Sequence, residues 1–411
     1  MPWKATTQNY TRATVRARRG FGQGLNAGGS RHEGAVVSKY PVVVVGAGPT
    51  GIAAASSLRD RGVNVVVLDR DEQVASSWRT RYDHLKLNTG RQFSHLPNHR
   101  YPRGTPTFPS RDQVVKHIER SAGGLDIQFR TTVERIDRGS GGWRLYTSAG
   151  DIEVRQVIVA TGYDHTPHMP KWPGTQRFTG EILHSSGYRN PARCAGKSVL
   201  VVGSGSSGME IAHDVATGGA ARVWMAVRTP PNIMMRTGPG GLPGDVIATP
   251  LFHVPPRIAD RIARRARLWA IGDLTKFGLP IPDEGPFSRS ARLGVAPALV
   301  DEAVINAIKD GVIEVVKPPG SSDGNTVSLV DGTRLHPDIV ICATGYRRGL
   351  EQLVGHLGVL DERGVPLATC GQPVADGLRF LGFLPRPSQI GYTSKRARRV
   401  ANEIANGLTL G

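Results

Sequence analysis

A strand, a glycine-rich turn and a helix within residues 40–58 constrain this chain more than any other stretch. Four valines at positions 42–45 predict a buried parallel strand, and they lead directly into the turn Gly46-Ala-Gly48-Pro-Thr-Gly51. In such a turn the first glycine makes the tight bend, the second lets the backbone approach a pyrophosphate, and the third lets the helix pack closely on the strand. The helix N-terminus then faces the negative charge. The segment predicts a dinucleotide site with contacts from Gly46, Ala47, Gly48, Pro49, Thr50 and Gly51.

An acid stands at the end of the next predicted strand. The apolar run 65–68 ends in Asp69, about 20 residues after the turn, where a carboxylate accepts hydrogen bonds from ribose hydroxyls. Strand, turn, helix, strand and acid are therefore in register, and this makes the prediction far more specific than the glycine pattern alone.

The same pattern returns after residue 197. An apolar strand leads into a turn with glycines at Gly203, Gly205 and Gly208, and the next strand, 223–227, is followed by Arg228 and Thr229. An acid there would repel a 2′-phosphate, whereas a guanidinium and a hydroxyl would bind one. We therefore expect an unphosphorylated adenosine, as in FAD, at the first site and NADPH at the second. The alternative is a surface arginine beside an NADH site.

Two similar strands suggest how the two units are connected. Residues 156–163 and 338–346 are both apolar runs that end in Ala-Thr-Gly-Tyr, and their recurrence suggests the points where the chain leaves and re-enters the first domain. The predicted fold is α/β, with two nested Rossmann-like dinucleotide-binding domains. Residues 36–165 and 335–411 would form the FAD-binding domain. Residues 170–334 would form the NADPH-binding domain, with a substrate-side helical insertion at 230–300.

The composition is that of a soluble globular protein with a strong basic excess. The 411 residues carry a net charge of +18, part of it in residues 1–35, which we expect to be a disordered basic Gly/Arg-rich tail. A transit segment or an over-extended start would explain that tail equally well. The arginine runs match no nucleic-acid module, and a solvated surface explains them better. Three separated cysteines indicate a reducing, cytoplasmic location. No apolar run is long enough for a membrane span. A homodimer is compatible with the sequence.

A further motif connects these features to a known family. The pattern FxGxxxHxxxY is complete as Phe178, Gly180, His184 and Tyr188, and other matches lie at 76–87, 196–203, 272–279 and 343–346. Together they resemble the flavin-containing monooxygenases, and within them the plant YUCCA-like enzymes and their bacterial relatives. The resemblance spans about residues 36–407 in the family's order. Tyr188 distinguishes the chain from Baeyer–Villiger monooxygenases, whose related motif ends in tryptophan.

The resemblance implies roles for individual residues. Asn88 matches the family asparagine between the nicotinamide and the reactive edge of the flavin, and His184 is either a catalytic residue or a hydrogen-bonded histidine at a domain junction. The implied FAD contacts beyond the first turn are Asp69, Ser77, Trp78, Asn88 and Thr89. The implied NADPH contacts are Leu87, Asn88, Ser207, Gly208, Met209, Glu210, Arg228 and Thr229.

The implied activity is an NADPH-consuming monooxygenation on FAD through a C4a-(hydro)peroxyflavin. One atom of O2 would be inserted into a small apolar or aromatic substrate. This substrate would be oxygenated at nitrogen or sulfur, or would be a 2-oxo acid such as indole-3-pyruvate that is oxidatively decarboxylated. Residues 382–391 depart from the YUCCA pattern near the flavin, which weakens the case for that plant substrate. We expect residues 230–300 to select the substrate, although the apolar stretch 251–277 could equally be ordinary core. The alternative function is an FAD/NADPH oxidoreductase that passes electrons to a protein or quinone.

Overall fold

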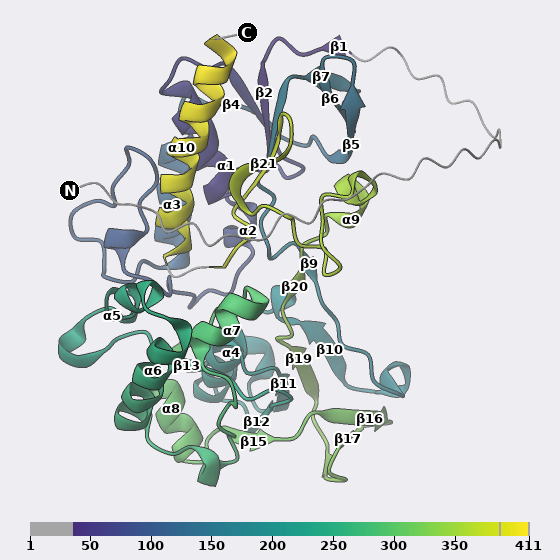
Figure 1. The fold of residues 1–411 in the computed structure, drawn as a ribbon. Helices are drawn as coiled ribbons and strands as arrows, with labels where there is room; N and C mark the ends of the chain where they lie inside the picture. The colour runs from purple at the N-terminus through teal and green to yellow at the C-terminus, as the bar shows by residue number, and fades with distance from the viewer. Residues whose placement is uncertain (1–35, 386–387, 410–411) are drawn as a thin grey trace. The chain divides into compact units, whose positions relative to one another are not determined.

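The computed structural model describes residues 36–385 and 388–409, and these belong to one compact unit. The expected disordered tail at 1–35 lies outside the described residues. Within the described part, two larger sheets, each with its own helices, organise the chain (Figure 1). None of the helices in these residues has both the length and the apolar character needed to cross a bilayer.

The first sheet contains the first glycine-rich turn. Its six strands run in the order β21-β22-β8-β2-β3-β4, and the strands from β22 to β4 are parallel. The strands are β2 (Val42–Val45), β3 (Val65–Leu68), β4 (Asp126–Gln128), β8 (Gln156–Val159), β21 (Cys370–Ala375) and β22 (Leu378–Leu381). Every residue of β2 and β3 is buried, which explains their continuous β-branched sequence.

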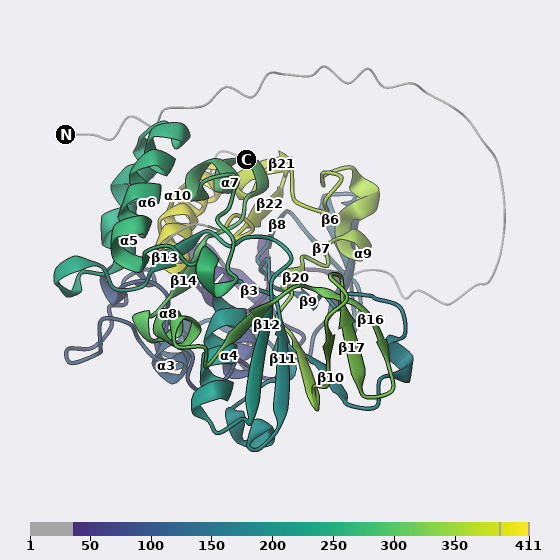
Figure 2. The ribbon, with the colours of Figure 1, turned by 90° about the horizontal axis from the view of Figure 1, so that it is seen from below.

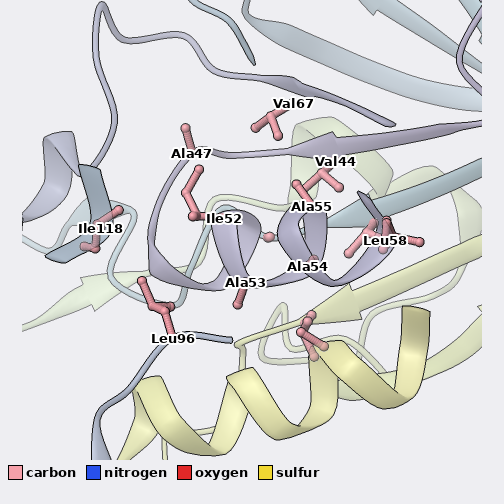
Figure 3. Packing of buried hydrophobic residues seen from close by; sticks show 14 of the residues in the cluster. Val44, Ala47, Ile52, Ala53, Ala54, Ala55, Leu58, Val67, Leu96 and Ile118 are labelled. Atoms are coloured by element: carbon pink, nitrogen blue, oxygen red, sulfur yellow. The ribbon is translucent and has the colours of Figure 1, made fainter. Parts of the chain in front are cut away.

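Three helices cover one face of this sheet. They are α1 (Pro49–Arg59), α3 (Arg111–Ala122) and α10 (Gln389–Thr409). The alanines 53–55 of α1 are buried, and their small size lets α1 lie close to α10 on one side and to the valines of β2 and β3 on the other (Figure 3). The other face packs on a smaller sheet of β1 (Val36–Val37), β7 (Ile152–Val154), β6 (Gly142–Thr147) and β5 (Val133–Gly139).

The second sheet is fully parallel and contains the second glycine-rich turn. Its order is β10 (Glu181–His184), β19 (Ile339–Cys342), β11 (Ser198–Val202), β12 (Arg222–Ala226) and β15 (Glu314–Val316). Helices α4 (Ser206–Thr217) and α8 (Glu302–Lys309) contribute to the core on one face. The antiparallel strands β16 (Pro319–Asp323), β17 (Thr326–Leu329) and β18 (Arg334–Leu335) contribute to the core on the other.

The predicted domain boundary at residue 335 is wrong. Residues 339–342 form β19, which pairs with β10 and β11 in the second sheet, not with the first. Each Ala-Thr-Gly strand lies against its own glycine turn, because a Cβ on Gly46 would be 2.8 Å from the Ala160 oxygen and one on Gly203 would be 2.4 Å from the Ala343 oxygen. The chain leaves the second sheet only after β19. Its connection β20 (Tyr346–Arg347) pairs antiparallel with the outgoing connection β9 (Thr166–Pro167).

The insertion predicted at 230–300 contains helices, as expected. Strands β13 (Ile233–Met235) and β14 (Ala298–Val300) pair at its two ends, and α5 (Gly244–Ala248), α6 (Pro256–Ile271) and α7 (Pro286–Leu293) lie between them (Figure 2). The core interpretation of 251–277 is wrong for α6, where only Ala259 and Ile271 are buried. The remaining elements are α2 (Ser76–Arg79), α9 (Glu351–Val354), η1 (Arg91–Phe93), η2 (Thr175–Arg177), η3 (Ser185–Gly187), η4 (Pro191–Cys194), η5 (Pro239–Gly241), η6 (Thr249–His253), η7 (Thr275–Phe277) and η8 (Gly355–Leu357).

Candidate active site

The two glycine-rich turns have nearly identical geometry. Gly48 and Gly205 both have φ of −76° with extended ψ, a conformation open to any residue, and a Cβ on either would meet no protein atom within 4 Å. Neither packing nor backbone strain therefore explains these two glycines. A bare backbone that faces open space at a helix N-terminus is the surface that a pyrophosphate needs. Both turns fit a dinucleotide on this ground.

The third glycine of each turn has a different role. A Cβ on Gly51 would lie 1.8 Å from the Gly46 oxygen, and one on Gly208 would lie 2.0 Å from the Gly203 oxygen. These glycines hold helix against strand, as the pattern predicts.

Asp69 follows β3 directly and faces the first turn. One carboxylate oxygen accepts from the Ala47 amide and the other from the Asp71 amide at 2.9 Å, while burial raises the pKa of the group. The Ala75 amide donates to the Ala47 oxygen at 3.1 Å and brings α2, with Ser77 and Trp78, to the same turn. The predicted acid and α2 are therefore together at the first site.

Arg228 lies one residue beyond the position equivalent to Asp69, which was expected for it from the sequence. Val45 is level with Leu68 across β2 and β3, and Val202 with Ala226 across β11 and β12, so Val227 rather than Arg228 stands where Asp69 stands. Val227 is buried, whereas Arg228 and Thr229 are exposed. The second site thus has an apolar residue in place of the acid and an exposed cation beside it.

Asn88 is held by an arginine that the sequence analysis did not identify. Arg236, which follows β13 and is 3% exposed, donates from Nη2 to the Asn88 side-chain oxygen at 3.0 Å. A guanidinium only donates, so the amide oxygen of Asn88 must face Arg236 and its NH2 group must face away. Among the described residues, none accepts a hydrogen bond from that NH2 group. Asn88 therefore presents a free donor.

The same arginine joins the two halves of the site. Its guanidinium pairs with Glu210 of α4 and with Asp301 at 2.7 Å, and Glu210 also accepts from the Tyr82 hydroxyl. Asp245 of α5, which is buried, accepts from the Gly90 amide at 3.1 Å two residues after Asn88. The loop that carries Asn88 is therefore fixed by the insertion and by α4. The apolar segment 230–235 gave no signal for this beyond a single arginine directly after it.

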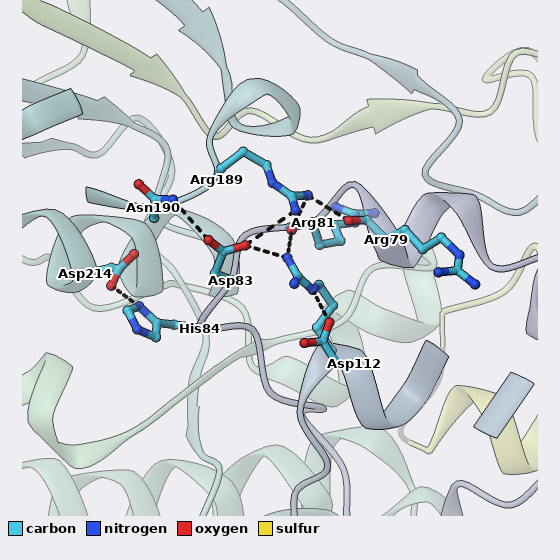
Figure 4. A network of polar contacts seen from close by, with 9 residues as sticks. Arg79, Arg81, Asp83, His84, Asp112, Arg189, Asn190 and Asp214 are labelled. Carbon is cyan, nitrogen blue, oxygen red and sulfur yellow. Dashed lines mark hydrogen bonds and ion pairs between the residues drawn. The ribbon is translucent and has the colours of Figure 1, made fainter. Parts of the chain in front are cut away.

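A second polar network fixes the start of that loop (Figure 4). Asp83 accepts from Asn190 at 3.0 Å and from Arg111 at 2.6 Å, and these contacts, with Asn190 the larger cause, lower the pKa of its carboxyl. Arg189 donates to the backbone oxygens of residues 79 and 81. Segment 189–190, which lies between β10 and β11, thus ties the loop before Asn88 to the second sheet.

Comparison with known proteins decides the family. A family model described as pyridine nucleotide-disulphide oxidoreductase matches residues 43–238. The indole-3-pyruvate monooxygenase YUCCA1 of Oryza sativa subsp. japonica is 36% identical over 372 residues, 88% of this chain and 90% of the relative. The probable indole-3-pyruvate monooxygenase YUCCA8 of Arabidopsis thaliana is 33% identical, over 89% and 88% of the two chains. The chain belongs to the flavin-containing monooxygenase family.

Solved structures agree on the fold. The flavin-containing monooxygenase from Stenotrophomonas maltophilia matches with a TM-score of 0.68 and 23% identity over 89% of this chain and 98% of that one. OTEMO, solved in complex with FAD and NADP, matches with a TM-score of 0.70 and 17% identity over 91% and 86%. The two nested Rossmann-like domains expected from the sequence are the fold of this family.

The four residues of the flavin-containing monooxygenase motif are packed or hydrogen-bonded within the protein. Phe178 and Tyr188 are buried, and a Cβ on Gly180 would lie 2.6 Å from the Phe178 ring. The Ser186 amide donates to Nδ1 of His184 at 3.1 Å, so the ring proton is on Nε2, which donates to the Gly345 oxygen at 3.0 Å. Both ring nitrogens are thus used, and burial lowers the pKa of His184. Of the two interpretations of His184, the structure favours the hydrogen-bonded histidine at a junction over the catalytic one.

Replacing His184 by alanine is expected to cost stability and not chemistry. The change leaves the Ser186 amide and the Gly345 oxygen without their partner, which typically costs about 1–3 kcal/mol for each group that stays buried. The melting temperature should fall, while the pH dependence of kcat in the folded fraction should stay as in the wild type. Loss of one limb of the pH profile in the variant would instead make His184 an acid or base.

Two predicted NADPH contacts are unavailable as side chains. Met209 is fully buried in the core beneath α4, and its backbone amide donates to the Gly205 oxygen at 3.0 Å within the helix. Glu210 is already engaged by Arg236 and Tyr82. Glu210 thus contacts the same arginine that donates to Asn88.

The cysteines give no support to disulfide chemistry in this monooxygenase. Cys194, Cys342 and Cys370 are all free, and burial raises the pKa of Cys342 to about 12. A thiol in that state is a poor nucleophile at neutral pH. The matched residues 43–238 contain both glycine-rich turns and one cysteine, Cys194.

Proposed function

We propose that this flavoprotein is an FAD-dependent monooxygenase that consumes NADPH, forms a C4a-(hydro)peroxyflavin and inserts one atom of O2 into a small organic substrate. One observation carries the cofactor assignment. Two turns with the same open glycine geometry are each followed by a second strand, and Asp69 comes directly after the first of these strands, whereas Val227 and Arg228 come after the second. An acid suits a ribose hydroxyl, whereas a cation without an acid beside it suits a 2′-phosphate.

The protein's own part is to bind, orient and exclude water. FAD, when bound, supplies the redox chemistry and the reaction with oxygen. Gly48 and Asp69 would hold its pyrophosphate and ribose, Gly205 would hold the pyrophosphate of NADPH, and Arg228 would hold the 2′-phosphate. Asn88 would offer its NH2 group as a neutral hydrogen-bond donor near the flavin. An amide donates without releasing its proton, so it can stabilise bound oxygen without protonating it.

The substrate that we favour is an aromatic 2-oxo acid of the indole-3-pyruvate type. The support is that relatives named for this substrate match about nine-tenths of both chains at 33–36% identity. Amines and thioethers, which need electrophilic oxygen, are the competing class. A 2-oxo acid needs attack on its carbonyl and loses carbon dioxide.

A labelled-oxygen experiment tests both the monooxygenase reaction and the choice of substrate. The enzyme with NADPH and ¹⁸O2 is given indole-3-pyruvate, a tertiary amine or a thioether, and NADPH use, hydrogen peroxide and product are measured together. One ¹⁸O atom in indole-3-acetate with little peroxide is the expected result. Label in the amine or thioether product instead would keep the monooxygenase and reject the substrate. Peroxide equal to NADPH with every substrate, together with rapid quinone reduction, would favour the electron-transfer alternative.

Replacing Arg228 by alanine should change coenzyme preference. Loss of a charge-assisted contact to the 2′-phosphate typically weakens binding by about 10- to 150-fold. The Kd for NADPH should rise by that factor, while the Kd for NADH should hardly change, as measured by flavin reduction at varied coenzyme concentration. The matched control is Arg222→Ala at the start of β12, where Arg222 pairs with Glu314. Equal losses for NADPH and NADH in Arg228→Ala would mean that Arg228 does not contact the phosphate.

A further inference from the structure

Helix α6 exposes an unusual set of apolar side chains. Trp269 is 78% exposed, the highest value among the large apolar residues of the described chain, and Ile258 and Ile262 are 48% and 46% exposed. At about 100° per residue, positions 258, 262 and 269 fall within about 40° on one line along the helix. They form a line of exposed apolar side chains, and the exposed Arg265 lies beside this line between Ile262 and Trp269. Such stripes on a protein surface usually mark an interaction site.

A basic stripe runs beside the apolar one. Arg257, Arg261 and Arg264 fall within about 60° of one another on the helix and are all exposed, and Leu268, 44% exposed, lies within the same range. Within the described chain, these three guanidiniums form no ion pair with any carboxylate. We refer to Ile258, Ile262 and Trp269 together with Arg257, Arg261 and Arg264 as the α6 face.

The acid of α6 is turned away from this face. Asp260 accepts from the Phe287 amide at 2.7 Å and from the Ser288 amide at 3.1 Å, at the start of α7. The buried Ala259 and Ile271 lie at the two edges of an inward sector of about 120° that includes Asp260. Helix α6 is thus attached to the protein by one side only, and the opposite side carries positive charge and apolar area without negative charge. Figure 2 shows α6 at the margin of the described unit beside α5.

We propose that the α6 face binds the surface of an anionic lipid bilayer, with the helix lying in the plane of the interface. A helix with arginines along one stripe and aliphatic and indole side chains along the next has the composition of interfacial helices. The arginines would contact lipid phosphates. Trp269 would lie at the level of the lipid headgroups, with its apolar ring toward the acyl chains and its N–H group toward water. This inference does not depend on the proposed reaction.

Charge and chemistry disfavour the other occupants. A second copy joined through this face in a two-fold dimer would bring the same arginines against each other. Nucleic acid would match the arginines but would gain nothing from covering Ile258 and Ile262. An anionic bilayer satisfies both stripes, since each basic residue near such a surface contributes about 1 kcal/mol and the apolar stripe enters the acyl boundary.

The test is flotation of the full-length protein with vesicles of phosphatidylcholine alone or with about 30% phosphatidylglycerol. The wild type should float with the anionic vesicles only, and less as salt rises. Arg261→Glu/Arg264→Glu should weaken this binding at least about 30-fold. Trp269→Ser/Ile262→Ser should weaken it without changing net charge. Flavin content and melting temperature, measured on each variant, verify that the site and the fold are intact.

Two matched controls accompany these variants. Arg103→Glu/Arg334→Glu removes the same charge from exposed positions elsewhere, and Val330→Ser/Leu367→Ser removes exposed apolar area elsewhere. Both should bind like the wild type. The proposal is wrong if the charge control loses as much affinity as Arg261→Glu/Arg264→Glu. It is also wrong if both α6 variants bind like the wild type, and vesicle binding would then be attributed to the basic residues 1–35. A dimer that Trp269→Ser disperses, or duplex DNA binding that outcompetes vesicles, would also overturn it.

Discussion

Replacing Gly48 by leucine is expected to give a folded protein that contains no FAD. The backbone at this position has an ordinary φ of −76°, and a Cβ there meets no protein atom within 4 Å. The substitution should therefore be tolerated by the fold, and its side chain should occupy only the space where the pyrophosphate must approach. Flavin absorbance should fall from about one FAD per chain to near zero. The melting temperature should fall only by the stabilisation that bound FAD provides.

The second turn offers a matched control. Gly205→Leu makes the same change in the same geometry, so the protein should keep its FAD and lose reduction by NADPH. Gly51→Ala should behave differently from both, because its Cβ would lie 1.8 Å from the Gly46 oxygen and the helix could not stay in place. The assignment of FAD to the first turn fails if Gly48→Leu keeps its flavin, and also if Gly205→Leu is the variant that loses it.

The parts of the fold that the sequence predicted well are those coded locally. A valine run, a glycine turn and a following helix occupy fewer than about 20 residues, and the second and third glycines of the turn are explained by open space beside it or by atoms within it. Gly51 and Gly208 illustrate this, because their close neighbours are the oxygens of Gly46 and Gly203 in the same turns. Asp69 could be placed for the same reason, since it follows the next strand directly.

The wrong or missing predictions concern residues whose position depends on strand order or on packing between segments far apart in the sequence. The run at 339–342 has the sequence of a buried strand, but nothing in it states which of two sheets it joins. Arg228 was placed one residue early in the comparison with Asp69, because strand ends were aligned and not the register with β11. Arg236 was missed because its partners Asn88, Glu210 and Asp301 are 148, 26 and 65 residues away. A single arginine in an apolar segment was the available signal.

Replacing Asn88 by aspartate is expected to uncouple NADPH oxidation from oxygenation. The wild-type amide oxygen faces Arg236, and its NH2 group is the donor left for the flavin site. An ionised aspartate has no proton to donate. It would also share Arg236 with Glu210 and Asp301, so that one cation would face three carboxylates with a net charge of about −2. A negative charge 4 Å from anionic oxygen on the flavin repels it by ~4 kcal/mol at an effective dielectric near 20.

The variant should still be reduced by NADPH, because hydride transfer precedes the reaction with oxygen. It should release hydrogen peroxide nearly in proportion to the NADPH consumed and form little product. Arg236→Met should uncouple less strongly, since the amide keeps its donor but loses the contact that orients it. Asn325→Asp, which adds the same charge at an exposed position between β16 and β17, should leave coupling unchanged. If Asn88→Asp still couples NADPH oxidation tightly to oxygenation, Asn88 does not lie at the site where oxygen reacts. The Arg236 contact would then not serve to orient a donor there.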